Sequence, residues 1–383
     1  MVEDIDILTS GSVGLLKEMI AIASPSFGED EVCSFISGWL TDNGVEHERR
    51  GNNIIAEHII DPSRPTLMLC AHIDTVAACE DYSFDPYRPD YQKAAEVISK
   101  IREERLSPSQ VVAGLGSNDD GGSVVAMIAA YRHFIGSPDN IILVLTCEEE
   151  RSGKNGMTGL WGTRLCSRKE AKEGCTAVDF AIVGEPTGMK AAIAERGLLV
   201  IDATAYGISG HAARNEGKNA IYMAVEDIER LKSHEFERVS PRMGKVNLNV
   251  TQINAGTAHN VIPDRCSFVI DIRPTEKYSN EEILKELQKI CSSELIPRNL
   301  SNRSSATAEG SPLQKTADAL GIATFSSPTT SDWMRISCDA VKMGPGESER
   351  SHKQNEYVLV SEIADGIRTY IDFINHYHEY TLE

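Results

Sequence analysis

Three apolar stretches that each run into polar residues decide the fold: PTLMLCAHID (65–74), IILVLTCEEE (141–150) and FAIVGEP (180–186). Continuous apolar runs of this length are typical of strands that are buried on both faces. Helical patterns separate them, which predicts an α/β fold with a mixed, mostly parallel sheet flanked by helices. In such sheets ligands bind at the carboxyl ends of the strands. The polar residues that follow the three strands are therefore expected to face one site.

The residues at these strand ends form a candidate metal-binding set with two others, one expected near a helix N-terminus between the first two strands and one late in the chain. Its members are two imidazoles and three carboxylates: His72, Asp119, Glu150, Glu185 and His352. Nitrogen and oxygen ligands without a thiolate suit Zn²⁺, with Co²⁺ or Mn²⁺ as substitutes, in a hydrolytic site. Three carboxylates and a hydroxide balance two divalent ions, whereas one ion would leave buried charge uncompensated. The set therefore predicts a pair of metal ions.

Two more acids at the same strand ends are candidates for catalysis. Asp74 lies two positions after His72, where its carboxylate can accept the second imidazole N–H and fix the ring. Glu149 directly precedes Glu150 and points elsewhere, so it can face a water molecule as a general base. The third acid of this run, Glu148, is interpreted as structural.

Composition narrows the class of protein. Of 383 residues, 38 are Lys or Arg and 57 are Asp or Glu, which gives a formal net charge of −19. This charge argues against nucleic acid and anionic membranes as partners. No apolar run is long enough to span a bilayer, and the acidic first twenty residues do not resemble a secretory signal. Nine cysteines without a CxxC pair fit reduced thiols, and we expect a cytoplasmic protein.

The pattern of the chain changes after the third strand. Between about residues 197 and 290 it reads as a strand, a helix, two strands and a helix, which is the order of a small α/β sandwich that lacks one strand. We therefore predict an inserted second domain at 191–303. The first domain then comprises 1–190 and 304–383, because His352 adds a further candidate ligand after the insertion.

Nine short segments occur in an order that resembles a known family. They are AHIDTV, GLGSNDDGG, TCEEE, VGEPT, SGHAA, NVIP, DIRP, GPGE and SHKQNE. Together they are similar to the dinuclear zinc peptidase and deacylase superfamily (M20-type), which includes acetylornithine deacetylase, succinyl-diaminopimelate desuccinylase, aminoacylase and carboxypeptidase G. The resemblance spans about residues 15–375. It implies a zinc-exopeptidase-like catalytic domain, a lid domain at the insertion, and a homodimer formed through that lid.

The resemblance also implies how the ligands divide between two zinc ions. His72 and Glu185 bind one ion, Glu150 and His352 bind the other, and Asp119 bridges both. In the family, a residue placed like Asp74 orients the histidine. A residue placed like Glu149 shuttles the proton during amide hydrolysis, which makes this carboxylate the expected general base.

The chain departs from the family pattern at two points. His72 and Asp119 are 47 positions apart. The stretch DYQKAAEVISKIREERLSPSQ (90–110) fills this long interval like an extra helix, which covers the cleft or extends an interface. Asp120 directly follows Asp119, so the assignment of the bridging carboxylate stays open by one position. Asp120 is alternatively a helix cap.

Five further residues are implied to bind substrate. His211 in SGHAA resembles the lid histidine that reaches the scissile carbonyl across the dimer interface, and Asn260 in NVIP resembles its companion. Arg273 in DIRP, Gly344 and Gly346 are similar to elements that receive the α-carboxylate of the substrate. On a strand, Arg273 could equally pair with a neighbouring acid.

The expected substrate is a small N-acyl amino acid. VGEPT, the GPGE loop and the length look most like acetylornithine deacetylase, which implies N-acetylornithine, N-acetylcitrulline or an N-succinyl counterpart and a place in arginine biosynthesis. A dipeptidase or a succinyl-diaminopimelate desuccinylase with the same metals is the alternative. A cationic pocket residue would favour the desuccinylase, and the sequence identifies none. A non-catalytic metal-binding relative is the second alternative.

Overall fold

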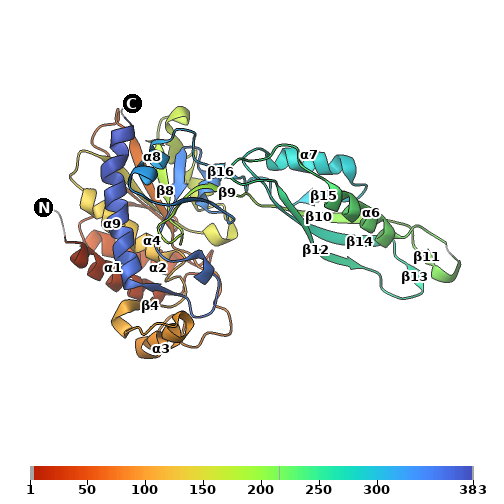
Figure 1. The fold of residues 1–383 in the computed structure, drawn as a ribbon, viewed down its shortest axis with the longest axis horizontal. Coiled ribbons are helices and arrows are strands. Elements are labelled where there is room, and N and C mark those ends of the chain that lie inside the picture. The colour runs from red at the N-terminus through yellow and green to blue at the C-terminus, as the bar shows by residue number, and fades with distance from the viewer. Residues whose placement is uncertain (1–3, 215, 382–383) are drawn as a thin grey trace. The chain divides into compact units, whose positions relative to one another are not determined.

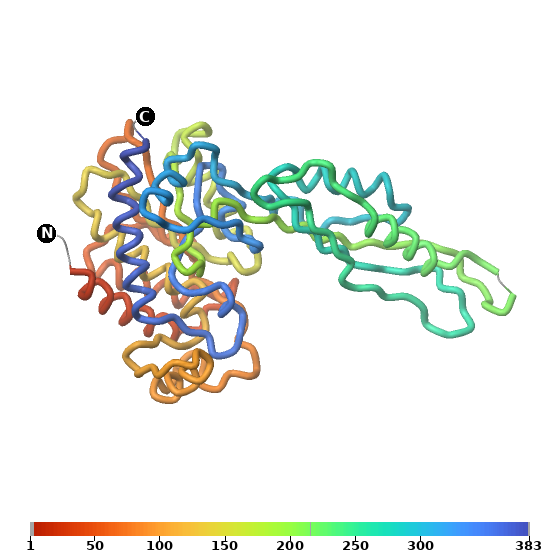
Figure 2. The backbone as a smooth tube through the Cα atoms, viewed as in Figure 1, coloured from red at the N-terminus to blue at the C-terminus, as the bar shows by residue number. Residues whose placement is uncertain are grey.

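The chain forms two compact units in the computed structural model, which describes residues 4–214 and 216–381. The first unit runs to Ile193 and resumes with Thr307–Phe325 and the residues from Ser331 onward. The second comprises Ala194–Ala306 and Ser326–Thr330. Figure 2 shows this in colour, since the first unit combines the red-to-yellow start of the chain with its blue end. The main boundaries lie three residues after the expected ones.

The first unit is built on a mixed sheet with the strand order β1-β2-β5-β3-β8-β18-β9. Strands β5, β3, β8 and β18 are parallel to one another, and the outer strands pair antiparallel. This confirms the expected fold class. The strand bounds are β1 Glu48–Arg50, β2 Asn53–His58, β5 Asn140–Thr146, β3 Thr66–His72, β8 Phe180–Val183, β18 Asp339–Lys342 and β9 Ala191–Glu195.

Both faces of the central strands are buried, which explains their continuous apolar sequence. Leu67 and Leu69 of β3 belong to one core, and the alternate residues Met68 and Cys70 belong to another. Helices α1, α4 and α9 contact one another over the first core (Figure 1). The helices of this unit are α1 Ile5–Ile20, α2 Asp30–Asp42, α3 Tyr91–Arg102, α4 Gly121–Phe134, α5 Met157–Leu160, α8 Pro312–Ala319 and α9 Val360–Tyr377.

The long interval between His72 and Asp119 contains the expected extra helix, α3. This helix packs on the short ladder of β4 (Val111–Ala113) and β19 (Tyr357–Leu359). A separate small core of Ala94, Ile98, Leu106 and other residues holds the three elements together. The long interval between His72 and Asp119 therefore packs against the segment that follows His352.

The second unit is a four-stranded antiparallel sheet in the order β12-β14-β10-β15. Burial alternates along β10 and β14, and α6 and α7 pack against the buried face. The added strand β15 completes the sandwich that the sequence predicts. The bounds are β10 Leu199–Tyr206, β11 Gly210–His211, α6 Ala220–Ser233, β12 Asn247–Ala255, β13 Val261–Ile262, β14 Arg265–Arg273, α7 Asn280–Ile290 and β15 Glu294–Pro297.

Local capping sets where the helices of the second unit begin. The Asn219 side chain accepts the Ile221 N–H at the start of α6, and Ser279 forms a capping box with Glu282 at the start of α7.

The remaining short strands are β6 Leu165–Ser167, β7 Thr176–Val178, β16 Ser305–Ala306 and β17 Thr324–Ser327. Within the described part of the chain, no helix has the length and apolarity to cross a membrane.

Candidate metal centre

Three parallel neighbours, β5, β3 and β8, end at the same edge of the first sheet. The register pairs His72 with Thr146 and Cys70 with Val183, so β3 and β5 end level and β8 ends two residues earlier at the same edge. Glu149 and Glu150 follow β5 through a single-residue left-handed turn at Glu148, and Glu185 follows β8. The expected convergence of the strand ends is therefore present in the structure.

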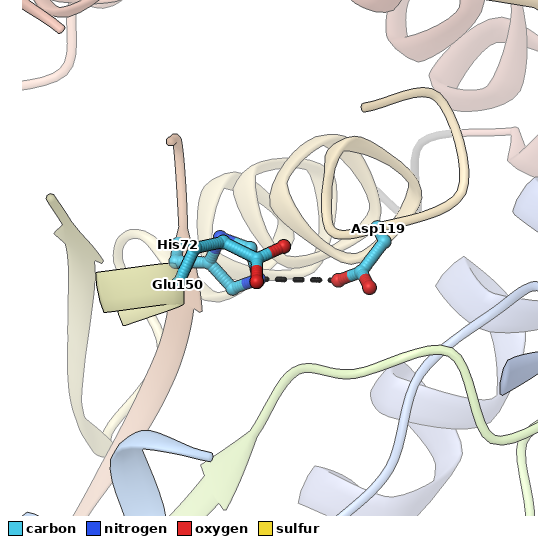
Figure 3. A group of neighbouring side chains, drawn as sticks. All are labelled: His72, Asp119 and Glu150. Atoms are coloured by element: carbon cyan, nitrogen blue, oxygen red, sulfur yellow. Dashed lines mark hydrogen bonds and ion pairs between the residues drawn. The ribbon is translucent and has the colours of Figure 1, made fainter. Parts of the chain in front are cut away.

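Two groups of side chains converge at this edge. Ligand atoms of His72, Asp119 and Glu150 lie within 4.8 Å of one another, and the same holds for His72, Glu149 and Glu185. Figure 3 shows Asp119 facing His72, with 3.2 Å between its Oδ1 and His72 Nε2. Ligand atoms on one ion, each at about 2.1 Å from the metal, are separated by distances of this size.

His352 joins the same site from the loop before β19. Its Nε2 lies 2.9 Å from Oε1 of Glu150 and 3.6 Å from Oδ2 of Asp119. Its side chain is about half exposed (54%), whereas those of its two partners are nearly buried. All five expected ligands therefore meet at one edge of the first unit.

The electrostatics of the cluster fit cations. Burial and the neighbouring Asp119 raise the pKa of the Glu185 carboxyl well above its ordinary value. Burial likewise raises the pKa of Glu149, with added repulsion from Asp332 and Glu150. Carboxylates this close repel one another when ionised, and divalent cations reverse that repulsion. Because the donors are imidazoles and carboxylates, the residues present fit two ions such as Zn²⁺, Co²⁺ or Mn²⁺.

The structure separates the two adjacent aspartates. Asp119 contacts His72 and His352, whereas Asp120 belongs to neither group of converging ligands. Both carboxylate oxygens of Asp120 are buried, and burial raises its pKa to about 8. Asp120 occupies the N-cap position of α4 but makes no side-chain capping bond. The geometry therefore favours Asp119 as the bridging residue.

Asp74 does more than the sequence suggests. Its backbone carbonyl lies 2.9 Å from His72 Nδ1, closer than its carboxylate oxygen at 3.4 Å. The carboxylate accepts the backbone N–H groups of Glu149 (3.0 Å) and Glu150 (3.2 Å) and the hydroxyl of Ser26 (2.7 Å). Burial opposes ionisation of Asp74, but the neighbouring His72, with the hydrogen bonds from Ser26 and Glu149, holds its pKa below the ordinary value. One side chain thus fixes the histidine and the two neighbouring glutamates together.

Two buried acids near the site were not identified from the sequence. Asp332 accepts a 2.6 Å hydrogen bond from the Thr146 hydroxyl, and burial raises its pKa to about 6. Glu356 accepts backbone N–H groups from the loop that carries Asp119. Neither residue lies in a pattern that predicts burial, since each follows polar residues in a loop.

The other residues of the run and the nearby thiols have structural roles. Glu148 is buried and its carboxylate accepts the backbone N–H and the side-chain amide of Asn155, as its structural interpretation expects. Burial raises the pKa of both Cys70 and Cys147. A neutral buried thiol is a poor nucleophile, so neither cysteine is suited to attack a substrate.

Among the expected substrate-binding residues, three lie in the second unit. His211 is exposed on β11 and pairs with Val261 of β13, next to Asn260. Arg273 ends β14 and forms a two-point ion pair with Asp271, at 2.9 and 3.2 Å. Arg273 thus has the local partner that the sequence left open as an alternative to substrate binding.

The two glycines expected to bind substrate lie buried in the first unit. A Cβ atom on Gly344 would lie 2.3 Å from the Ser123 hydroxyl, and one on Gly346 would lie 2.3 Å from Asn118 Oδ1. The Gly344 N–H donates to the Thr187 hydroxyl. Close packing therefore accounts for both glycines, and their contact with a substrate stays a prediction.

Comparisons with known proteins agree with this architecture. Residues 193–299 match the family model described as the peptidase dimerisation domain. A succinyl-diaminopimelate desuccinylase of Xanthomonas campestris pv. campestris is 25% identical, over 93% of this chain and 96% of its own.

Solved structures resemble the fold of this chain over nearly its full length. Aminopeptidase PepT from Bacillus cereus has a TM-score of 0.70 at 18% identity, covering 97% of this chain and 99% of its own. A dinuclear metal-binding peptidase of the M20 family from Bacillus subtilis has a TM-score of 0.67 at 16% identity with the same coverage. At these identities the likeness to solved structures concerns the fold.

Proposed function

We propose that this chain, a metal-dependent amidohydrolase of the M20-type superfamily, hydrolyses the amide bond of an N-succinyl amino acid. The choice of a succinyl group rests on the likeness to succinyl-diaminopimelate desuccinylase, which extends over nearly the full length of both chains. The first expectation from the sequence, N-acetylornithine and arginine biosynthesis, has no such support. The alternative that the sequence left open, a desuccinylase, is therefore preferred.

Five side chains hold the proposed metal pair. His72 and Glu185 would hold one ion, Glu150 and His352 would hold the other, and Asp119 would contribute to both. The contacts that join His72 to Asp119 and His352 to Glu150 support this division. When bound, two divalent cations of this kind polarise the amide carbonyl and lower the pKa of a water molecule towards neutrality. Zn²⁺ is the proposed ion because the donors are imidazole and carboxylate.

Glu149 moves the proton in the proposed reaction. It accepts a proton from the attacking water, and the hydroxyl of that water becomes part of the released carboxylate. The C–N bond then breaks, and Glu149 returns the proton to the amine nitrogen. The raised pKa of Glu149 supports the return of the proton to the amine, since its carboxyl holds a proton readily. Asp74 keeps Glu149 beside the ligand Glu150 through the two backbone hydrogen bonds.

A panel of substrates tests the proposal. Purified protein with two Zn²⁺ equivalents is assayed with N-succinyl-diaminopimelate, N-succinylornithine, N-acetylornithine, N-acetylcitrulline and a dipeptide. We expect kcat/KM to be at least about tenfold higher for the succinyl compounds, because a site built to bind a second carboxylate discriminates against analogues that lack it. Preference for N-acetylornithine would restore the first expectation. Hydrolysis of none of them, with both metals bound, would exclude deacylation.

The second unit is proposed to join two copies of the chain. The match of residues 193–299 to a peptidase dimerisation domain supports this assembly. His211 and Asn260 then contribute to substrate binding from this unit, as the resemblance implies. A chain of 41.9 kDa should give about twice that mass in light scattering. A monomer mass at micromolar concentration, together with full activity, would rule out a role for the partner subunit in catalysis.

A further inference from the structure

Glu356 is a buried carboxylate whose hydrogen bonds all go to one loop. Its Oε1 accepts the backbone N–H groups of Asn118 and Asp119, both at 2.9 Å, and its Oε2 accepts the N–H of Gly116 at 3.1 Å. The residue is 2% exposed. No Lys or Arg in the described part of the chain forms an ion pair with it.

Glu356 accepts hydrogen bonds from the loop that contains Asp119. The loop that contains Glu356 itself also contains His352. The two loops are about 240 positions apart in the chain. They meet again at Asn118, whose side chain donates to the Glu347 carbonyl (3.1 Å) and accepts the Glu347 N–H (2.9 Å). The proposed bridging ligand and the proposed last ligand are thus joined outside the metal site itself.

The backbone of the second loop needs this support. His352 has a φ of 58° and Asn355 a φ of 60°, both in the left-handed region that non-glycine residues rarely occupy. Asn355 is held in turn by Ser83, which donates its N–H at 2.7 Å and accepts from the side-chain amide at 3.2 Å. Ser83 belongs to the long interval that also contains α3. The extra segment therefore braces the His352 loop from outside.

We infer that Glu356 is a positioning residue that sets the spacing of the metal pair by fixing the Asp119 loop against the His352 loop. The inference rests on the proposed function, because it assumes that both residues bind metal. Glu356 itself touches neither ligand side chain. It acts through the backbone of residues 116–119, as the outer partners of metal ligands commonly do.

Glu356→Gln tests this role without changing the size of the side chain. The amide oxygen can still accept the N–H groups of Asn118 and Asp119, but the amide nitrogen then faces the Gly116 N–H, and two donors repel. We expect the affinity for the ion held by Glu150 and His352 to fall about 10- to 100-fold. We also expect kcat to fall while KM stays within about twofold. The Co²⁺-loaded variant should show an altered absorption spectrum.

Asp227→Asn is the matched control. Asp227 is also a fully buried carboxylate that accepts two backbone N–H groups, from Ser292 and Ser293, but it lies in the second unit. Its substitution should cost stability and leave both metal affinities unchanged. Equal losses of metal affinity in the two variants would reduce the effect to general destabilisation and overturn the inference.

Metal titration by calorimetry separates the possible failures. If the native protein binds fewer than two ions, the proposed function fails. If it binds two ions and Glu356→Gln binds both with native affinity, the positioning role fails. Should Glu356→Gln not accumulate as folded protein, Glu356→Asp decides, because its shortened carboxylate keeps the charge but withdraws from the loop. Native metal affinity in that variant would overturn the inference.

Discussion

Replacing Glu149 by Gln lowers kcat by about 10²- to 10⁴-fold, if this residue is the general base. Gln has nearly the same size but cannot take a proton from water at neutral pH. Glu149 is not one of the five proposed ligands, so the variant should bind two metal ions as the native protein does. The measurement is kcat on the preferred acyl amino acid, with metal content determined on the same sample.

Glu148→Gln provides a control one residue away. Glu148 hydrogen bonds Asn155 and takes part in neither group of converging ligands, so kcat should stay within about fivefold of the native value. A Glu149→Gln variant with near-native kcat and both metals bound would contradict the assignment of the base. Loss of metal from that variant would instead assign Glu149 as a ligand.

Removing the metal ions with a chelator is expected to abolish hydrolysis and to destabilise the first unit. The cluster brings at least four acidic side chains together at the strand ends, and their repulsion is no longer balanced. Ligands present at a thousand times their Kd stabilise a folded protein by about 4 kcal/mol. For a unit of this size the thermal midpoint should therefore fall by on the order of 10 °C.

Adding metal back identifies the ions. Zn²⁺, Co²⁺ or Mn²⁺ should restore both activity and the thermal midpoint, and full recovery should require two equivalents per chain. The inserted unit, which contains none of the proposed ligands, should unfold at the same temperature with and without metal. Full activity in the chelated protein would contradict the proposed metal dependence, and recovery with one equivalent would contradict the pair.

The fold and the convergence of the candidate ligands could be predicted because strands buried on both faces leave a plain signal. β3, β5 and β8 are continuous apolar runs, and each stops where a polar residue reaches the sheet edge. Parallel pairing then brings the strand ends that precede Glu150 and Glu185 to the same edge as His72. The inserted sandwich could be predicted equally well, since apolar and polar residues alternate along its strands and its helices are capped by Asn219 and Ser279.

The supporting residues could not be predicted in the same way. The hydrogen bonds of Asp74 to two backbone N–H groups depend on how the turn after β5 folds, which no side-chain pattern encodes. Glu356 accepts hydrogen bonds from a loop and Asp332 accepts one from the last residue of β5, and both acids lie far along the chain from these partners. For Arg273 the sequence left two roles open, substrate binding and pairing with a neighbouring acid. Only the structure shows the local ion pair with Asp271.

On the ribosome, β8 emerges long before its neighbour β18, because the whole second unit is translated between them. Val183 and Asp339 are 156 positions apart, which corresponds to roughly 8–30 s of synthesis. During that time β8 presents an open strand edge, while the second unit, whose own strands are nearly contiguous in the chain, can already fold. His352 follows later still, so the proposed set of five ligands is complete only in the final moments of synthesis.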